Sequence, residues 1–144
     1  VIGVVRPMPN LDPARFSNES FSFFRRNSYD DFLAASTAGW GDGNVHVCLY
    51  YAASGKMEWT NWDIDDEEDL VDWEGMESCE NGVTIGMLLN VDDGTLTVYK
   101  NNRRLGVMQV GLSGSYCWHA TCWCTNNAWG GSTVTIRRGE PPGA

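Results

Sequence analysis

GVTIGMLLNVDDGTLTVYKNNRRLG, residues 82–106, is the most regular stretch of the chain. Its first half alternates apolar with mostly smaller or polar side chains, the period-two pattern of a strand with one buried face; the apolar positions of this face are Val83, Ile85, Met87, Leu89 and Val91. Asp93-Gly94 supplies the left-handed backbone that a two-residue hairpin turn requires, and Leu96 and Val98 resume the apolar face. Asn101-Asn102 predicts a second turn. The stretch therefore predicts three antiparallel strands joined by two tight turns.

Further short strands are expected on both sides of this stretch. The β-branched run Val1–Val5 ends at Arg6-Pro7, because proline cannot donate to a sheet ladder. Alternation also predicts strands within 45–51, 116–124 and 133–137, the last with Val134 and Ile136 directed inward. Scattered aromatics occupy residues 11–38, where only 30–35 suggests a helical turn. Short strands at this spacing, with glycine-rich turns, predict an all-β protein with an antiparallel β-sandwich.

The composition narrows the class of protein. The chain has 144 residues, enough for one domain with a single core. Its net charge of −9 argues against a nucleic-acid partner, because phosphate contacts need clustered Lys and Arg. No apolar run approaches the length of a membrane span, so we expect no membrane partner. The five cysteines lack the paired spacing of a zinc site, which favours reduced thiols in a cytoplasmic or nuclear protein.

Acidic residues are concentrated between Asp63 and Glu80, which hold ten of the nineteen in the chain. The simplest interpretation is a solvated loop held open by like-charge repulsion. Trp59, Trp62 and Trp73 flank this segment and either anchor it to the core or form a recognition surface for a basic partner. Its carboxylates are ligands of the kind that calcium prefers, but no glycine stands at the sixth place of an EF-hand loop, so we expect no metal.

Enzyme chemistry has one candidate in the same segment. The run Asp63-Ile64-Asp65-Asp66-Glu67 is similar to the E-I-D-x-E strand of sandwich-fold glycosidases, and tryptophans stack on sugar rings. Asp63 and Glu67, at the two ends of this run, are four residues apart, which separates their backbones by roughly 13 Å along a strand. The two carboxyl groups of a retaining glycosidase must lie about 5–5.5 Å apart. No nucleophile elbow or phosphate-binding loop is present in the sequence. We therefore expect a protein that is not an enzyme and has no cofactor; a carbohydrate-binding or glycosidase sandwich using residues 59–73 is the alternative.

Four blocks of the sequence, taken in order, resemble the SPRY domain family. IGMLLNVDDGTLTVYKNNRRLG is similar to the family's I-G-x-x-L-D strand, D-x-G-T-L turn, F/Y-x-K-N-G turn and L-G pair, with Asn90 and Asn102 in place of the usual Asp and Gly. The other three blocks, which look like V-G-V-x-R, S-W-G and V-W-G with the last strand, are Val1–Arg6, Gly39–Gly41, and Ala128–Gly130 followed by Val134–Ile136. The family's opening W-E-V strand has no counterpart. The resemblance implies a single, N-terminally incomplete SPRY-like domain over 1–140 and a terminal linker at 141–144.

The resemblance also implies a function. SPRY domains are concanavalin A-like jelly-rolls that bind protein or peptide segments through loops at one edge of the sandwich, without enzymatic activity. The positions that match the family's peptide pocket are Arg6, Pro7, Tyr50 or Tyr51, Trp129 and Gly130. Trp129 is alternatively a plug at the end of the core. We expect a protein or peptide partner and no small-molecule ligand; a structural module whose acidic loop only keeps it soluble is the third hypothesis.

Overall fold

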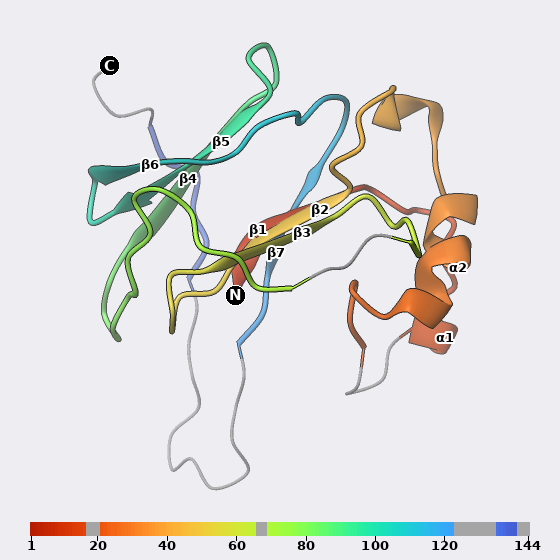
Figure 1. The fold of residues 1–144 in the computed structure, drawn as a ribbon, viewed down its shortest axis with the longest axis horizontal. Coiled ribbons are helices and arrows are strands. Elements are labelled where there is room, and N and C mark those ends of the chain that lie inside the picture. The colour runs from red at the N-terminus through yellow and green to blue at the C-terminus, as the bar shows by residue number, and fades with distance from the viewer. Residues whose placement is uncertain (17–20, 66–68, 123–134, 141–144) are drawn as a thin grey trace, which may run out of the picture.

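The computed structural model describes residues 1–16, 21–65, 69–122 and 135–140. Within them the chain forms two antiparallel sheets, an arrangement consistent with a β-sandwich, and a few short helices (Figure 1). The strands are β1 (Ile2–Val5), β2 (Val47–Tyr50), β3 (Met57–Thr60), β4 (Ile85–Asn90), β5 (Thr95–Lys100), β6 (Arg103–Gln109) and β7 (Cys117–Ala120). The four-stranded sheet has the order β3-β2-β1-β7, and the three-stranded sheet has the order β4-β5-β6. The helical elements are α1 (Pro13–Phe16), η1 (Arg26–Ser28), α2 (Tyr29–Ala34) and η2 (Ala38–Trp40).

The three strands expected from residues 82–106 are confirmed as β4, β5 and β6, but one of the two turns differs. Lys100 pairs with Arg103, so Asn101-Asn102 forms a two-residue turn with φ of 49° and 66°. Asn90 pairs with Thr95, so the first loop has four residues instead of two. The Asn90 side chain explains the longer loop. Its Oδ1 accepts hydrogen bonds from the backbone N–H groups of Asp92 and Asp93, each at 3.1 Å.

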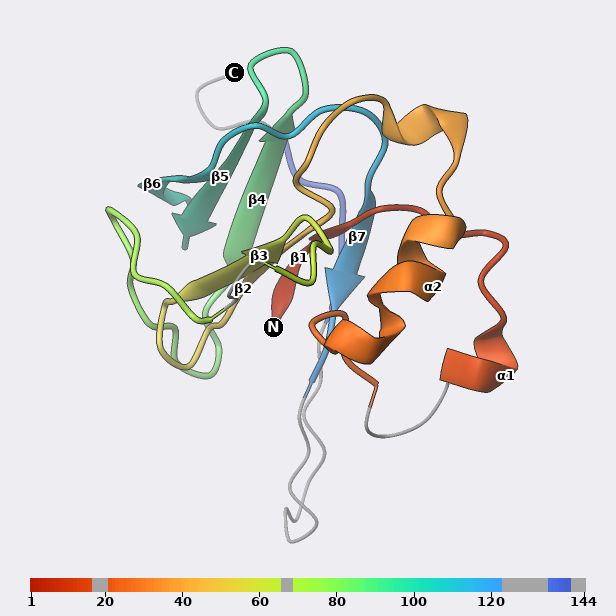
Figure 2. The same ribbon diagram turned by 45° about the vertical axis from the view of Figure 1, so that its right-hand side comes forward.

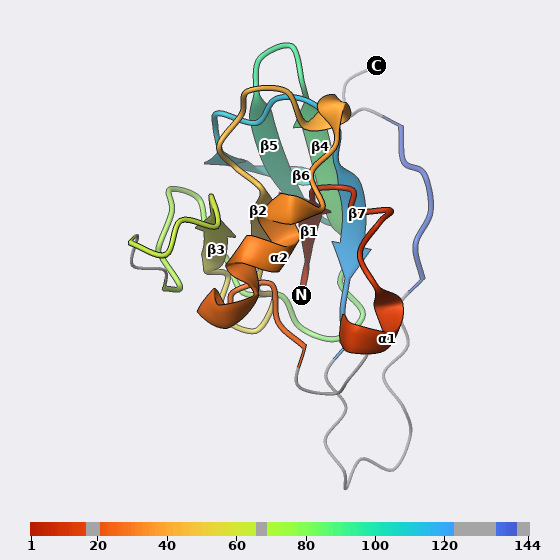
Figure 3. The ribbon, with the colours of Figure 1, turned by 90° about the vertical axis from the view of Figure 1, so that its right-hand side faces the viewer.

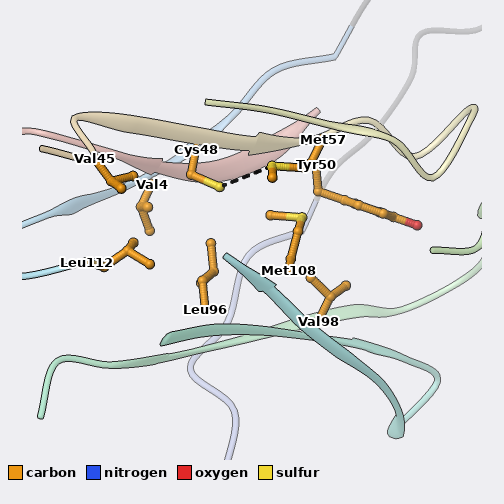
Figure 4. Close-up of a cluster of buried hydrophobic side chains, with 9 residues drawn as sticks. All are labelled: Val4, Val45, Cys48, Tyr50, Met57, Leu96, Val98, Met108 and Leu112. Atoms are coloured by element: carbon orange, nitrogen blue, oxygen red, sulfur yellow. Dashed lines mark hydrogen bonds between the residues drawn. The ribbon is translucent and has the colours of Figure 1, made fainter. Parts of the chain in front are cut away.

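The main core lies between the two sheets (Figure 4). The four-stranded sheet contributes side chains from alternate positions of β1, β2 and β3, and the three-stranded sheet contributes side chains from β5 and β6. Two loop residues, Val45 and Leu112, complete the core. The buried residues are Val4, Val45, Cys48, Tyr50, Met57, Leu96, Val98, Met108 and Leu112. Burial raises the pKa of the Cys48 thiol to about 12, so this cysteine is an inert part of the core. Ile85, Met87 and Leu89 pack against the cluster as their alternation predicts, whereas Val91 is 51% exposed and does not.

A second apolar layer covers the other face of the four-stranded sheet. Val47 and Leu49 of β2 pack there with Phe32 of α2, Trp40 and Trp62. Figures 2 and 3 show α2 lying over this sheet, on the side away from the three-stranded sheet. All four residues of β2 are therefore buried. Alternation in residues 45–51 predicts a strand with one buried face. That expectation is wrong, because the helical segment within residues 11–38, which has no clear sequence period, covers the second face.

Two further segments differ from expectation: one forms an additional strand, and one forms no strand where one was predicted. The structure adds β3, which lies just before the acidic segment Asp63–Glu80, and it confirms the helical turn near 30–35 as α2. Residues 135–140 form no strand and Ile136 is 70% exposed, so its expected inward direction is wrong. Val134 lies outside the described residues. Among the described helices, none has the length and apolar character needed to cross a bilayer.

Candidate functional site

A buried arginine organises one end of the four-stranded sheet. Arg6 follows β1 directly, and only 1% of it is exposed. Its guanidinium donates hydrogen bonds to backbone carbonyls of two distant loops, with Nη1 at 2.6 Å from Ser113 O and 3.1 Å from Ser115 O, and Nη2 at 3.2 Å from Gly43 O. Because arginine presents several donors in a rigid planar fork, one side chain fixes both loops relative to β1.

Aromatic rings surround this guanidinium. Its Cζ lies 4.2 Å from the centroid of the Tyr116 ring and 5.9 Å from that of Trp40, both within cation–π range. Tyr116 donates through its hydroxyl to Val45 O at 2.6 Å, and Trp40 donates through Nε1 to Pro7 O at 2.8 Å. Burial lowers the pKa of Arg6, yet an arginine stays charged because its ordinary pKa is so high. Ring faces and carbonyl dipoles thus stabilise the buried cation.

His46 completes the cluster and is neutral. The Nε–H of Arg6 donates to His46 Nδ1 at 3.2 Å, and an acceptor nitrogen there requires the proton to sit on Nε2. The imidazole lies between two indoles, with ring centroids 5.2 Å from Trp40 and 5.3 Å from Trp62. Burial, and secondarily the charge of Arg6, lowers the pKa of His46 to about 4.

This neutral histidine predicts a pH dependence of stability. The unfolded chain protonates His46 below about pH 6.5, whereas the folded chain does so only near pH 4. The free energy of unfolding is therefore expected to fall as the pH drops from about 6.5 to about 4, by up to about 1.4 kcal/mol per pH unit from this residue. Urea denaturation across this range measures it. The variant His46→Asn keeps an acceptor but cannot titrate, so its slope should be shallower; equal slopes would contradict the assignment.

We call the segments 39–44 and 110–115, together with Pro7, the loop edge. Backbone hydrogen bonds join its two loops to each other and to the β4–β5 loop: Ser115 N donates to Gly39 O at 2.8 Å, and Leu112 N donates to Gly94 O at 3.0 Å. At Gly114 (φ +82°) a Cβ would meet the Trp40 carbonyl, so this close approach needs glycine. The loop edge exposes Val110 (61%), Ser113, Ser115 and its glycines other than the half-buried Gly43.

The structure brings only part of the sequence-predicted site to the loop edge. Pro7 is partly exposed there, while Arg6 is a buried support. Tyr50 and Tyr51 lie at the opposite end of β2, because β1 and β2 are antiparallel and Arg6 N bonds to His46 O. His46 and Tyr51 are five residues apart, roughly 16 Å along a strand. Trp129 and Gly130 lie outside the described residues.

The two tyrosines have structural partners at their own end of the sheet. Tyr50 is fully buried; its hydroxyl donates to Glu77 O and lies 3.2 Å from the Sγ of Cys79. Tyr51 is partly buried and donates to a Glu58 carboxylate oxygen at 2.7 Å. Burial is the main cause that raises the pKa of both hydroxyls above the ordinary value. Both tyrosines therefore remain neutral donors that hold neighbouring segments in place.

The tryptophans of the acidic segment do not share one surface. Trp62 is 1% exposed and donates through Nε1 to Phe23 O at 3.0 Å. Trp73 is partly buried and donates through Nε1 to Gly55 O at 2.7 Å. Trp59 alone of the three is exposed, at 37%. The rings of Trp62 and Trp73 thus anchor the segment to the fold. The three tryptophans do not together form one surface on which a sugar could stack.

The sequence reasoning missed most of the residues around Arg6. Tyr116 and His46 lie within two of the predicted strands, and no local pattern in the sequence singles out Ser113 or Gly43 as partners of Arg6. No group of three or more His, Cys, Asp or Glu side chains within the described ranges has a metal-binding arrangement. Comparison with protein families, curated proteins and solved structures found no match for this chain.

Proposed function

We propose that this chain is a non-enzymatic protein-interaction module of the SPRY type, with a concanavalin A-like jelly-roll topology, that binds a peptide segment of a partner protein at the loop edge. The observation that carries the proposal is the buried Arg6 side chain, which ties both loops of this edge to β1. A surface fixed before binding loses less conformational entropy when a partner arrives. Trp129 and Gly130, outside the described residues, remain part of the proposed site.

The chemistry of the loop edge favours an extended, largely uncharged peptide. Its two loops contain five glycines, two serines and one ionisable residue, Asp42. Glycines allow a peptide backbone to approach closely, and exposed hydroxyls offer donors and acceptors to its amides. Val110 supplies an exposed apolar contact. Tyr50 and Tyr51 are not assigned to this site, because they lie at the other end of β2.

The reducing compartment expected from the sequence has one supporting observation. The described cysteines Cys48, Cys79, Cys117 and Cys122 are all free thiols. Free thiols persist where glutathione and thioredoxin keep cysteines reduced. A cytoplasmic or nuclear location, where such a module meets intracellular partners, belongs to the same proposal.

The test uses a random peptide library displayed on phage and selected against the full chain. We expect enriched peptides that carry an apolar residue, and a loss of affinity of tenfold or more in the variant Val110→Asp, because a carboxylate replaces the apolar contact. The matched control is Leu33→Asp on α2, which alters another exposed apolar side chain that belongs to neither loop of the loop edge. Thermal melting confirms that both variants are folded.

Two outcomes would overturn the proposal. One is that no peptide is enriched over the unselected library. The other is that the enriched peptides bind Val110→Asp as tightly as the unmodified chain, which would place their contacts elsewhere on the molecule.

A further inference from the structure

We propose that Ser28 is a phosphorylation site, and that its phosphate is held in a surface pocket by Arg15 and Arg25. Ser28 follows Arg25-Arg26-Asn27, so arginines stand two and three residues before it. Protein kinases with an acidic substrate groove select serines by this charge pattern. No other serine or threonine in the sequence follows two arginines at this spacing. The site is separate from the loop edge and does not depend on the function proposed there.

The segment before Ser28 is accessible to a kinase. Arg25, Arg26 and Asn27 are exposed, and Ser28 is partly exposed. Arg25 has an extended backbone, with φ of −87° and ψ of 107°, and η1 is a single turn of three residues. Extending the segment in a kinase groove therefore opens one short turn and no strand pairing. The kinase forms a P–O bond at Ser28 Oγ, breaks the bond between the γ-phosphorus of ATP and ADP, and takes the hydroxyl proton on its catalytic carboxylate.

The hydroxyl of Ser28 does not cap the helix that follows it. Ser28 immediately precedes α2, the position from which a serine side chain usually accepts a hydrogen bond from the first turn of a helix. Here the side chain makes no such bond. Ser28 instead lines a pocket of about 210 Å³, together with Arg15, Arg25 and Asn27. Phosphorylation of this hydroxyl therefore breaks no helix cap and places the phosphate beside the pocket.

The charges that line the pocket favour a phosphate. They are those of Arg15, Arg25 and Asp31, so positive charge exceeds negative. Asp31 orients Arg15, whose Nη1 and Nη2 each lie 3.1 Å from a carboxylate oxygen. A guanidinium has five N–H donors, so this pairing leaves donors of Arg15 for a second anion. Arginine pairs strongly with phosphate because two of its N–H groups bind two oxygens at once.

The phosphate connects two parts of the helical layer. Arg15 lies on α1, whereas Ser28 lies between η1 and α2 (Figure 2). A phosphoserine has three strong acceptor oxygens, enough to bind Arg15 and Arg25 together. Phe32 of α2 packs against the four-stranded sheet. Phosphorylation therefore ties α1 to the helix that covers this sheet.

The first test treats the full chain with ATP and the catalytic subunit of cyclic AMP-dependent protein kinase, and locates the phosphate by mass spectrometry. We expect phosphate on Ser28, and none at this position in Ser28→Ala. Arg26 belongs to the kinase motif but does not line the pocket, so Arg26→Gln should slow phosphorylation by about tenfold or more. Arg15 lines the pocket but lies outside the motif, so Arg15→Met should be phosphorylated at close to the unmodified rate.

Phosphorus-31 NMR then shows whether the pocket holds the phosphate. The second pKa of phosphoserine is about 6, and adjacent arginines lower it because they favour the dianion. The phosphorylated chain should titrate at a pH lower by about 0.5 or more than a phosphorylated peptide of residues 21–33, which has Arg25 but no pocket. Arg15→Met should lose most of this difference. The matched control Arg104→Met, which removes an exposed arginine of β6, should keep it.

Two outcomes would overturn the proposal. One is a full chain that accepts no phosphate on Ser28. The other is a phosphoserine that titrates alike in the unmodified chain, in Arg15→Met and in the peptide, because the pocket then does not hold the phosphate. Circular dichroism spectra that match the unmodified chain ensure that each variant is folded.

Discussion

Replacing Trp62 with alanine is expected to lower the free energy of unfolding by about 3–5 kcal/mol, the range found for large aromatic residues removed from a core. The ring is 1% exposed and lies 4.9 Å from the ring of Phe32 and 5.7 Å from that of Trp40, measured between centroids. The substitution also leaves the carbonyl of Phe23 without its indole donor. Trp62 has a φ of +56°, so packing holds its backbone in a conformation that side chains rarely adopt.

Urea denaturation followed by far-UV circular dichroism measures this loss, with Trp59→Ala as the matched control. Trp59 is 37% exposed, and we expect its removal to cost about 1 kcal/mol or less. The contrast distinguishes an anchor from a surface residue within one acidic segment. Equal losses in the two variants would mean that Trp62 does not hold the segment to the fold.

The strands of residues 85–109 were predictable because their side chains alternate between a core and an open face. A period of two then identifies a strand from sequence alone. The same logic identified β2 as a strand but not its second buried face, and it did not identify β3. Both faces of β2 are buried, one of them by the helical segment, and β3 is only Met57–Thr60, too short to show a period. A layer contributed by a segment without a clear sequence period leaves no local signal in the strand that it covers.

The candidate site was less predictable, because its geometry depends on partners that are distant in the sequence. Arg6 was expected to offer its donors to a peptide, but its acceptors are carbonyls 37, 107 and 109 residues away. Burial of an arginine is the exception in proteins, and only a structure shows that enough acceptors converge on it. The register of β1 and β2 likewise separates Tyr50 from Arg6, and no local pattern specifies that register.

Replacing Arg6 with methionine is expected to lower the free energy of unfolding by about 3 kcal/mol. Methionine approximates the length of the aliphatic stem, so packing is partly retained while every guanidinium hydrogen bond is lost. Three carbonyls and His46 Nδ1 lose their donor. Some of these carbonyls belong to exposed loop residues and regain water, which keeps the loss below that of breaking a fully buried ion pair. Urea denaturation measures it.

The controls for Arg6 separate its charge from its shape. Arg15→Met removes an exposed arginine that pairs with Asp31 at 3.1 Å, and should change stability by about 0.5 kcal/mol or less. Arg6→Lys keeps the charge but not the planar fork, so it should recover only part of the loss. In this lysine variant the amide of Ser115, bonded to Gly39 O, should exchange its hydrogen faster than in the unmodified chain, because the two loops are no longer fixed to β1. Full recovery of stability and unchanged exchange would show that a positive charge alone suffices, and that the fork of Arg6 does not organise the loop edge.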